Sequence, residues 1–314
     1  MEKVYFDVGW SRNSEFLESV VRMTPDNSGI WNDIEATESP EDSDYHIAFN
    51  APSIPDAYSQ TLLFCMEPPC TRHCLKWDRF DGIKYPVDEF YKPQRWWINL
   101  DYDELKELKP PKKSRNLSWI TTDKGRLNGL YGKFRRWLLS NDWKIHEYKD
   151  LPIVPRRINY LNKDLDGHIM RMGFLNKLKE NRFAELDLYG RGAFDDIDFY
   201  KGEIENKYDG LKNYRYSLAF ENYKGKNYFS EKIVDALLSW AMPIYWGCEN
   251  LSEFLPQRSY VRFDIERDNP EKIQEIIHSD LRENNLDAIA EAREIILDEL
   301  QIWPTVEKCI QELE

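Results

Sequence analysis

Residues 216–246, YSLAFENYKGKNYFSEKIVDALLSWAMPIYW, predict the kind of fold that the chain adopts. An apolar run ending at Phe220 is typical of a buried strand, and MPIYW at 242–246 is typical of a second one. Between them, apolar residues recur at the helical spacing i, i+3, i+4 and i+7, namely Ile233, Ala236, Leu237 and Trp240. A strand, a helix and a parallel strand form a βαβ crossover, so the segment predicts an α/β fold with a parallel sheet.

Shorter apolar runs predict further strands on the N-terminal side of this unit. Runs at 4–6, 45–49 and 61–65 are separated by Pro, Asp and Ser, which is typical of strands joined by loops and short helices. A strand at 117–121 and a helix at 131–139 then predict a second α/β unit.

The length and the breaks in pattern predict two domains. A chain of 314 residues exceeds what one core usually covers, and a cleft between two domains is where ligands usually bind. The stretch KPPKKSRN, where prolines and basic residues interrupt any regular element, marks the boundary between a domain over 1–112 and one over 113–284. Apolar residues at helical spacing, interrupted by Arg293 and stopped by Pro304, predict a packing helix over 285–314.

Composition excludes several classes of partner. The net charge of −13 opposes binding to nucleic acid or to anionic lipid. No signal peptide is visible in the first residues, and the longest apolar region, 233–248, is too short and too interrupted to span a bilayer. Five cysteines, an odd number, favour a reducing compartment. We therefore expect a cytoplasmic protein; peripheral attachment to the inner face of a membrane stays open, although 285–314 holds eight acidic and two basic residues.

Two patterns could hold a metal ion, and neither is convincing. One is a cluster of soft ligands, namely Cys65, Cys70, His73 and Cys74. It lacks any CxxC pair, so we interpret its cysteines as buried free thiols. The other is a set of DxD pairs, expected by chance in a chain with 56 acidic residues: Asp101/Asp103, Asp164/Asp166 and Asp196/Asp198. The five histidines are scattered without HxxxH spacing. We predict no metal site.

The segment 218–248 resembles the donor-binding signature of the bacterial-type α1,3-fucosyltransferases, glycosyltransferase family ten. The resemblance rests on FEN at 220–222, on a tyrosine two residues ahead of Ser230-Glu231-Lys232, and on PIYWG at 243–247. Weaker matches are LSWITTDKG (117–125), LDLYGRG (186–192), NKYDGLKNYRYSLAFEN (206–222) and FLPQRSYVRFD (254–264). The resemblance implies a GT-B-like fold, in which two Rossmann-type α/β domains face each other and the C-terminal one binds GDP-fucose.

Physical chemistry agrees with a nucleotide site at the start of the 231–240 helix. Ser230 is placed to cap that helix, whose N-terminal N–H groups attract a diphosphate. Lys232 adds a cation at the same end, suited to a leaving group that gains charge. The resemblance implies that Glu231 holds the ribose and Lys232 the phosphates. It also implies that Asn222 and Tyr228 complete the pocket.

One further cation is expected from the resemblance. The family has an arginine in the helix that follows the segment resembling LSWITTDKG, where it meets the diphosphate. The closest register puts Lys133 at this position, with Arg126 and Arg135 nearby. A lysine keeps the charge but loses the two-pronged contact of an arginine. Which of the three contacts the diphosphate stays open.

Glu67 is the predicted general base. In LLFCMEPPC (62–70) an apolar run delivers one carboxylate to a Pro-Pro turn, and the resemblance implies a glutamate at a comparable strand end of the N-terminal domain. The simpler alternative is that Glu67 only caps the turn. The competing carboxylates nearby are Asp78, Asp81 and Glu89.

The resemblance implies an inverting transfer of fucose from GDP-fucose to a hydroxyl of a glycan acceptor, α1,3 to N-acetylglucosamine or glucose. No cofactor and no metal are implied. Another GDP-sugar on the same fold, a catalytically silent nucleotide- or carbohydrate-binding protein and a zinc-stabilised interaction module remain alternatives.

Overall fold

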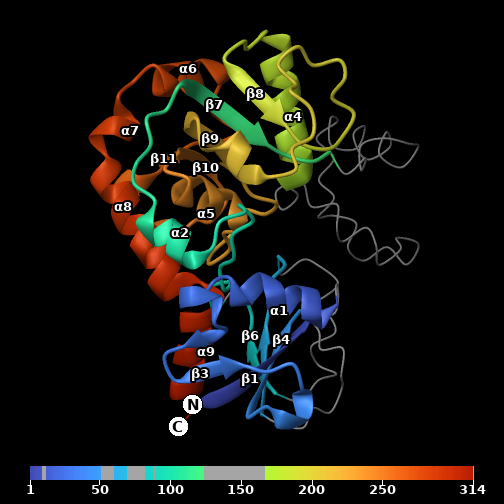
Figure 1. The fold of residues 1–314 in the computed structure, drawn as a ribbon. Helices are drawn as coiled ribbons and strands as arrows, with labels where there is room; N and C mark the ends of the chain where they lie inside the picture. The colour runs from blue at the N-terminus through green and yellow to red at the C-terminus, as the bar shows by residue number, and fades with distance from the viewer. Residues whose placement is uncertain (9–11, 51–59, 69–81, 88, 124–166, 314) are drawn as a thin grey trace, which may run out of the picture.

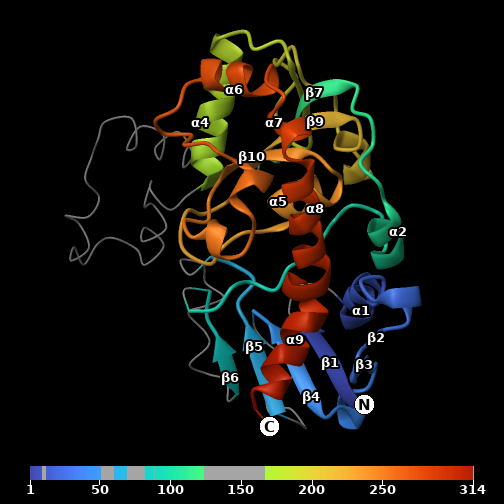
Figure 2. The same ribbon diagram turned by 90° about the vertical axis from the view of Figure 1, so that its left-hand side faces the viewer.

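The structure is a computed structural model that describes residues 1–8, 12–50, 60–68, 82–87, 89–123 and 167–313. These residues form two α/β domains, one above the other in Figure 1. The chain passes from the N-terminal to the C-terminal domain between β6 (Ile83–Tyr85) and β7 (Arg115–Ile120). Its last helix then returns to the N-terminal domain (Figure 2). The α/β fold class predicted from the sequence is confirmed.

The N-terminal domain is built on a six-stranded sheet in the order β2-β3-β1-β4-β5-β6. Its strands are β1 (Glu2–Val8), β2 (Ile30–Trp31), β3 (Ile34–Ala36), β4 (Tyr45–Phe49), β5 (Gln60–Phe64) and β6 (Ile83–Tyr85). All neighbours are parallel except β2 and β3. One face of β1 packs on helix α1 (Asn13–Val21), where Phe6 meets Phe16 at 6.2 Å between ring centroids. The predicted strands at 4–6, 45–49 and 61–65 are thereby confirmed.

The C-terminal domain is built on a five-stranded parallel sheet in the order β11-β10-β9-β7-β8. Its strands are β7 (Arg115–Ile120), β8 (Leu186–Tyr189), β9 (Tyr214–Phe220), β10 (Met242–Trp246) and β11 (Val261–Arg262). Helix α2 (Tyr102–Glu107) precedes β7. The other helices of this domain are α4 (Gly167–Glu180), α5 (Glu231–Leu238), α6 (Pro270–Ile277), α7 (Leu281–Asn284) and α8 (Leu286–Ile295).

Both domains also contain short 3-10 turns. Those of the N-terminal domain are Pro25–Asn27 and Pro40–Asp42, and those of the C-terminal domain are Lys207–Gly210, Leu251–Glu253 and Gln257–Ser259.

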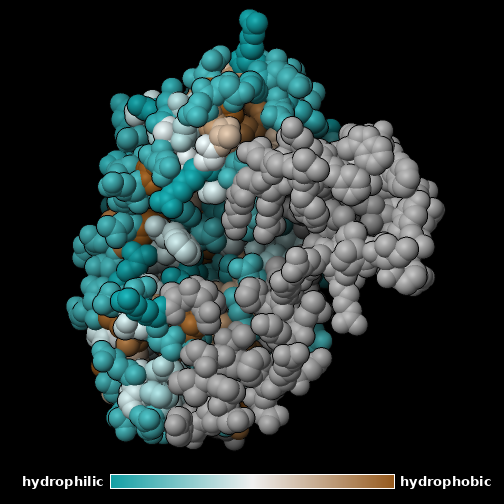
Figure 3. Space-filling view, turned by 90° about the vertical axis from the view of Figure 1, so that its right-hand side faces the viewer, coloured by the Kyte–Doolittle hydropathy of each residue, from teal (hydrophilic) through white to brown (hydrophobic). Residues whose placement is uncertain are grey.

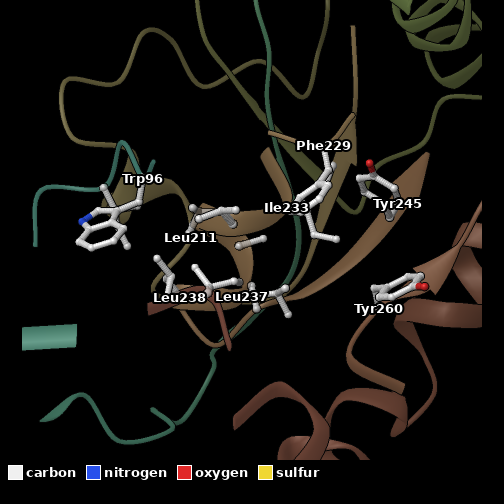
Figure 4. Packing of buried hydrophobic residues seen from close by; sticks show 14 of the residues in the cluster. Trp96, Leu211, Phe229, Ile233, Leu237, Leu238, Tyr245 and Tyr260 are labelled. Carbon is white, nitrogen blue, oxygen red and sulfur yellow. The ribbon is translucent and has the colours of Figure 1, made fainter. Parts of the chain in front are cut away.

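The predicted βαβ unit is confirmed by β9, α5 and β10. Strands β9 and β10 pair in parallel, with Phe220 opposite Trp246, and α5 packs between them and α8. Figure 4 shows Ile233, Leu237 and Leu238 of this helix inside the core, with Trp96 at one end of the group and Tyr260 at the other. The core is therefore built from the apolar helical face that the sequence predicts.

The C-terminal segment differs from the single packing helix expected over 285–314. Helix α8 continues as a π-helical turn (Ile296–Leu300), and a separate helix α9 (Ile302–Gln311) continues downward along the N-terminal sheet (Figure 2). The side chain of Gln301 caps α9 by accepting from the Trp303 N–H, so Pro304 lies in the first turn, where its missing N–H is harmless. The Trp303 indole donates to the Val20 carbonyl (2.8 Å) and packs edge-on against Phe6.

Arg293 interrupts the apolar pattern because it has a buried structural role. Its guanidinium donates to the carbonyl oxygens of Leu238 and Leu105, and it lies 4.5 Å from the centre of the Trp240 ring. On the face shown in Figure 3, by contrast, most described residues are hydrophilic and apolar patches are small. None of the described helices is long and apolar enough to cross a membrane.

Candidate active site

The loop that follows β9 is organised by a buried glutamate. Glu221 comes directly after Phe220 and has no exposed surface. It fits there because Gly247, at the end of the neighbouring strand β10, has no side chain: a Cβ on Gly247 would lie 2.4 Å from Glu221 Cγ. Gly247 also has φ of +150°, a conformation that other residues rarely adopt.

Glu221 ties the loop to the start of α5. Its carboxylate accepts hydrogen bonds from the Ser230 N–H (2.8 Å) and the Ser230 hydroxyl (2.6 Å), and it lies 3.4 Å from the Lys232 Nζ. The Ser230 oxygen in turn accepts from the Lys232 N–H and caps α5, as the sequence predicts. The helix start is therefore held by a buried, charge-assisted network.

Glu231 and Lys232 lie side by side at this helix start. The Lys232 Nζ is 3.0 Å from Glu231 Oε1, and the two side chains are 16% and 21% exposed, respectively. Burial opposes ionisation of Glu231, but the charges of Lys232, Lys207 and Lys92 outweigh it and hold the pKa of Glu231 well below its ordinary value. The carboxylate is thus ionised at neutral pH and can accept hydrogen bonds.

Further cations surround this pair. The Lys207 Nζ is 3.2 Å from the buried carboxylate of Asp235, whose pKa burial raises. Arg95 contributes a guanidinium that burial keeps at a pKa of about 10, against the attraction of Glu231. The described surroundings of Glu231 are therefore rich in positive charge, which favours an anionic ligand.

Asn222 and Tyr228 lie in the same loop. The Asn222 carbonyl accepts from the Gly167 N–H (2.9 Å), and its side-chain oxygen is buried with no hydrogen-bond donor among the described residues. Tyr228 is buried, and its ring meets that of Tyr223 edge-on with centroids 5.7 Å apart. A buried acceptor without a donor is a position that a ligand hydroxyl or amine can satisfy.

The structure brings Glu67 to this loop from the other domain. Glu67 follows β5 and is partly exposed, and its backbone carbonyl accepts from the Cys65 thiol (3.0 Å). Cys65 packs in one small cluster with Val87 and Tyr228. The charge of Glu67 contributes, after burial and Glu221, to raising the pKa of Tyr228. Of the competing carboxylates, Glu89 is exposed, and Asp78 and Asp81 lie outside the described residues.

Lys133, Arg126 and Arg135 also lie outside the described residues, but another cation lies in a helix that the structure describes. Helix α4 is the described helix between β7 and β8, and it carries Arg171. This side chain is 3% exposed, donates to the Phe220 carbonyl (3.3 Å) and contacts His168 Nδ1 (2.6 Å). Its charge acts on Tyr228. Arg171 was not among the sequence candidates because the prediction placed the cation in a helix at 131–139, which lies outside the described residues.

A metal centre is not formed by the described residues, in which no three His, Cys, Asp or Glu side chains gather closely enough to hold an ion. Asp101 instead caps α2 by accepting from the Glu104 N–H, and Asp103 accepts from the Asp26 N–H. Asp196 pairs with Lys179. Cys70, His73, Cys74, Asp164 and Asp166 lie outside the residues that the structure describes.

Comparison with known proteins bears on the same segment. Residues 157–285 match the family model described as glycosyltransferase family 10 (fucosyltransferase), C-terminal. This segment is therefore similar to glycosyltransferase family ten. The matched range of family ten includes Arg171, Asn222, Tyr228 and Ser230-Glu231-Lys232, whereas Lys133 and Glu67 lie outside it. The resemblance found in the sequence is thereby confirmed.

Individual relatives match over short stretches. The chain is 40% identical over 58 residues to the alpha-(1,3)-fucosyltransferase FucT of Helicobacter pylori, covering 18% of this chain and 12% of that protein. It is 26% identical over 155 residues to the GDP-fucose protein O-fucosyltransferase 3 of Danio rerio, covering 45% and 31%. The chain thus spans less than a third of the length of either relative. A crystal structure of an alpha1,3-fucosyltransferase with GDP-fucose is 16% identical, with a TM-score of 0.45 over 96% of this chain and 92% of that one.

Proposed function

We propose that this chain is a fucosyltransferase that uses GDP-fucose as donor and a glycan hydroxyl as acceptor. The observation that carries the proposal is the start of α5, where buried Glu221 fixes Ser230 and Lys232 inside the segment that matches family ten. A helix N-terminus with an adjacent ammonium is suited to a diphosphate. Glu231, kept ionised by its lysine neighbours, is suited to accept hydrogen bonds from the ribose hydroxyls.

We infer an inverting displacement. The Glu67 carboxylate takes the proton of the acceptor hydroxyl while that oxygen attacks the anomeric carbon of fucose from the face opposite GDP. The bond between the anomeric carbon and the phosphate oxygen breaks, and its electron pair leaves with GDP. Lys232 and the α5 N-terminus stabilise the charge that develops there. The nearness of Glu67 to Tyr228 supports its assignment as the base.

We also propose that Arg171, rather than Lys133, supplies the arginine that the family has next to the diphosphate. Arg171 lies in the helix between β7 and β8 and within the family match, and Lys133 lies outside that match. Replacement of each residue by methionine separates the two. Arg171→Met is expected to weaken GDP binding and Lys133→Met to leave it nearly unchanged; the reverse result would restore Lys133.

A panel of nucleotide sugars tests the donor. We expect GDP release with GDP-fucose and a glycan acceptor, and little with GDP-mannose or UDP-sugars. Preference for another nucleotide sugar would contradict the proposal. A screen of acceptors ending in N-acetylglucosamine or glucose, followed by NMR of the product, tests the α1,3 linkage and the inverted anomeric configuration.

We propose that the protein acts in the cytoplasm. The described thiols Cys248 and Cys309 are buried and free, which fits a reducing environment. Fractionation of cells that express the full chain checks this location and also any peripheral attachment to the inner face of a membrane.

A further inference from the structure

A segment between the two domains runs along the donor loop. The Lys92 Nζ lies 5.7 Å from the centre of the Tyr228 ring, and the Gln94 amide donates to the Phe229 carbonyl (3.3 Å). Farther along, the Trp97 N–H donates to the carboxylate of Asp235 (2.7 Å). Residues 92–97 therefore follow the loop and helix that carry the proposed donor site, although they lie far outside the family match.

This segment is fixed by both domains. The Gln94 N–H donates to the Leu300 carbonyl (2.8 Å), and the Gln94 carbonyl accepts from the Ile302 N–H (3.1 Å), which joins the segment to the start of α9. Arg22, at the end of α1, donates to the carbonyls of Trp96 and Ile98 at 2.9 Å each. The backbone that carries Lys92 is thus held by hydrogen bonds to both sides, and its position is preorganised.

Lys92 is a cation with an incomplete environment. Its side chain is partly buried, and its ammonium makes no hydrogen bond or ion pair with any residue that the structure describes. Burial lowers the pKa of Lys92, and Glu231, Glu221 and Glu67 act on it only through their more distant charges. Removing an ammonium from water without a direct partner is costly, and an anionic ligand would offset that cost.

We propose that Lys92 binds the diphosphate of the nucleotide-sugar donor, together with the start of α5. The inference rests on the proposed function and adds a contact from the interdomain segment to a site otherwise built by the C-terminal domain. The charges of both Lys232 and Glu67 act on Lys92, so its ammonium lies within electrostatic range of the donor residues and of the proposed base. Its ammonium contacts a phosphate oxygen, and the same contact strengthens as the departing GDP gains charge.

Binding of GDP, guanosine and inorganic pyrophosphate to the full chain, measured by calorimetry, tests this role. Lys92→Met is expected to raise the dissociation constant for GDP about 10-fold or more, the usual size of a lost hydrogen bond to a charged group. Guanosine binding should change little, because it has no phosphate. Lys92→Arg keeps the charge and should bind GDP nearly as well as the natural protein. The matched control is Lys84→Met, since Lys84 is an exposed lysine on β6.

The outcomes separate this inference from the proposed function. If Lys92→Met binds GDP as tightly as Lys84→Met does, while Lys232→Ala binds it poorly, Lys92 is not a diphosphate ligand and the donor site stands. If GDP binds none of these proteins, both proposals fail. A loss of guanosine and GDP binding in equal measure would also overturn the inference, because it would indicate a disturbed Tyr228 loop. Melting temperatures without ligand identify a misfolded variant, for which Lys92→Gln is the replacement.

Discussion

In each domain a glutamate follows an apolar strand, but the two glutamates differ in burial and in their hydrogen-bond donors. Glu67 follows the apolar strand β5, and Glu221 follows the apolar strand β9; both are at the carboxyl ends of parallel strands, where α/β sheets bind ligands. Glu221 is fully buried and accepts hydrogen bonds from Ser230, whereas Glu67 is partly exposed and lies near Tyr228. The comparison teaches that an apolar strand ending in glutamate does not define a role; burial and donors do.

The largest expected effect is on catalysis, at Glu67. Glu67→Gln keeps the size of the side chain but cannot take a proton, so turnover should fall about 100-fold or more. Stability should change little. Steady-state kinetics with Glu89→Gln as the control, an exposed carboxylate in the same domain, would measure this. Near-normal turnover by Glu67→Gln would remove it from the mechanism and leave the turn-capping alternative.

Glu221 should show the opposite pattern, with its main effect on stability. Glu221→Gln replaces one acceptor oxygen by a donor amide that faces the Ser230 donors, and we expect a loss of about 2 kcal/mol in the free energy of unfolding. GDP binding should weaken with it, because Lys232 loses its neighbour. Denaturant unfolding beside the exposed control Glu249→Gln checks the effect. Equal stability of the two variants would mean that Glu221 does not organise the loop.

A third glutamate, Glu231, gives a smaller effect that depends on pH. Because its pKa is held below the ordinary value of 4.5, the ionised group stabilises the folded state above that pH and loses this contribution as the pH falls below it. Glu231→Gln should therefore be less stable than the natural protein by about 1 kcal/mol at neutral pH. The difference should shrink in acid. A difference that stays constant from neutral to acid pH would contradict the proposed charge cluster.

Chelation should have the smallest effect. Neither strand-end glutamate belongs to a metal cluster among the described residues, and Lys232 supplies positive charge at the helix start. We predict that EDTA leaves most of the proposed fucosyltransferase activity. Loss of activity on chelation and its return with manganese would bring an acidic pair into the mechanism.

Local features of the site could be predicted from the sequence because they depend on neighbours along the chain. The apolar spacing of Ile233, Ala236 and Leu237 gives helix α5, which Ser230 caps; the helix ends at Leu238, so Trp240, with φ of +59°, lies beyond the predicted helical face. The strand, helix and strand of this unit are consecutive, so their arrangement follows from the handedness and length of the crossover. The parallel pairing of β9 and β10 is the result.

Contacts between distant segments could not be predicted in this way. Arg171, the proposed diphosphate contact, was not among the sequence candidates because residues 124–166 separate β7 from the helix that carries it, and the prediction took the first helical pattern after the strand. Arg293 interrupts an apolar pattern in the sequence, and only the structure shows the buried carbonyl oxygens to which it donates. The approach of Lys92 to Tyr228 joins two domains and leaves no local periodic signal.

Thermal unfolding with and without saturating GDP tests most directly whether the C-terminal domain binds the donor while the N-terminal domain supplies the base. A ligand that binds only the folded state raises the melting temperature. We predict that GDP raises it for the natural protein and equally for Glu67→Gln, and that the shift disappears in Lys232→Ala. No shift in the natural protein, or a shift lost in Glu67→Gln and kept in Lys232→Ala, would contradict a donor site at the start of α5 with the proposed base supplied from the other domain.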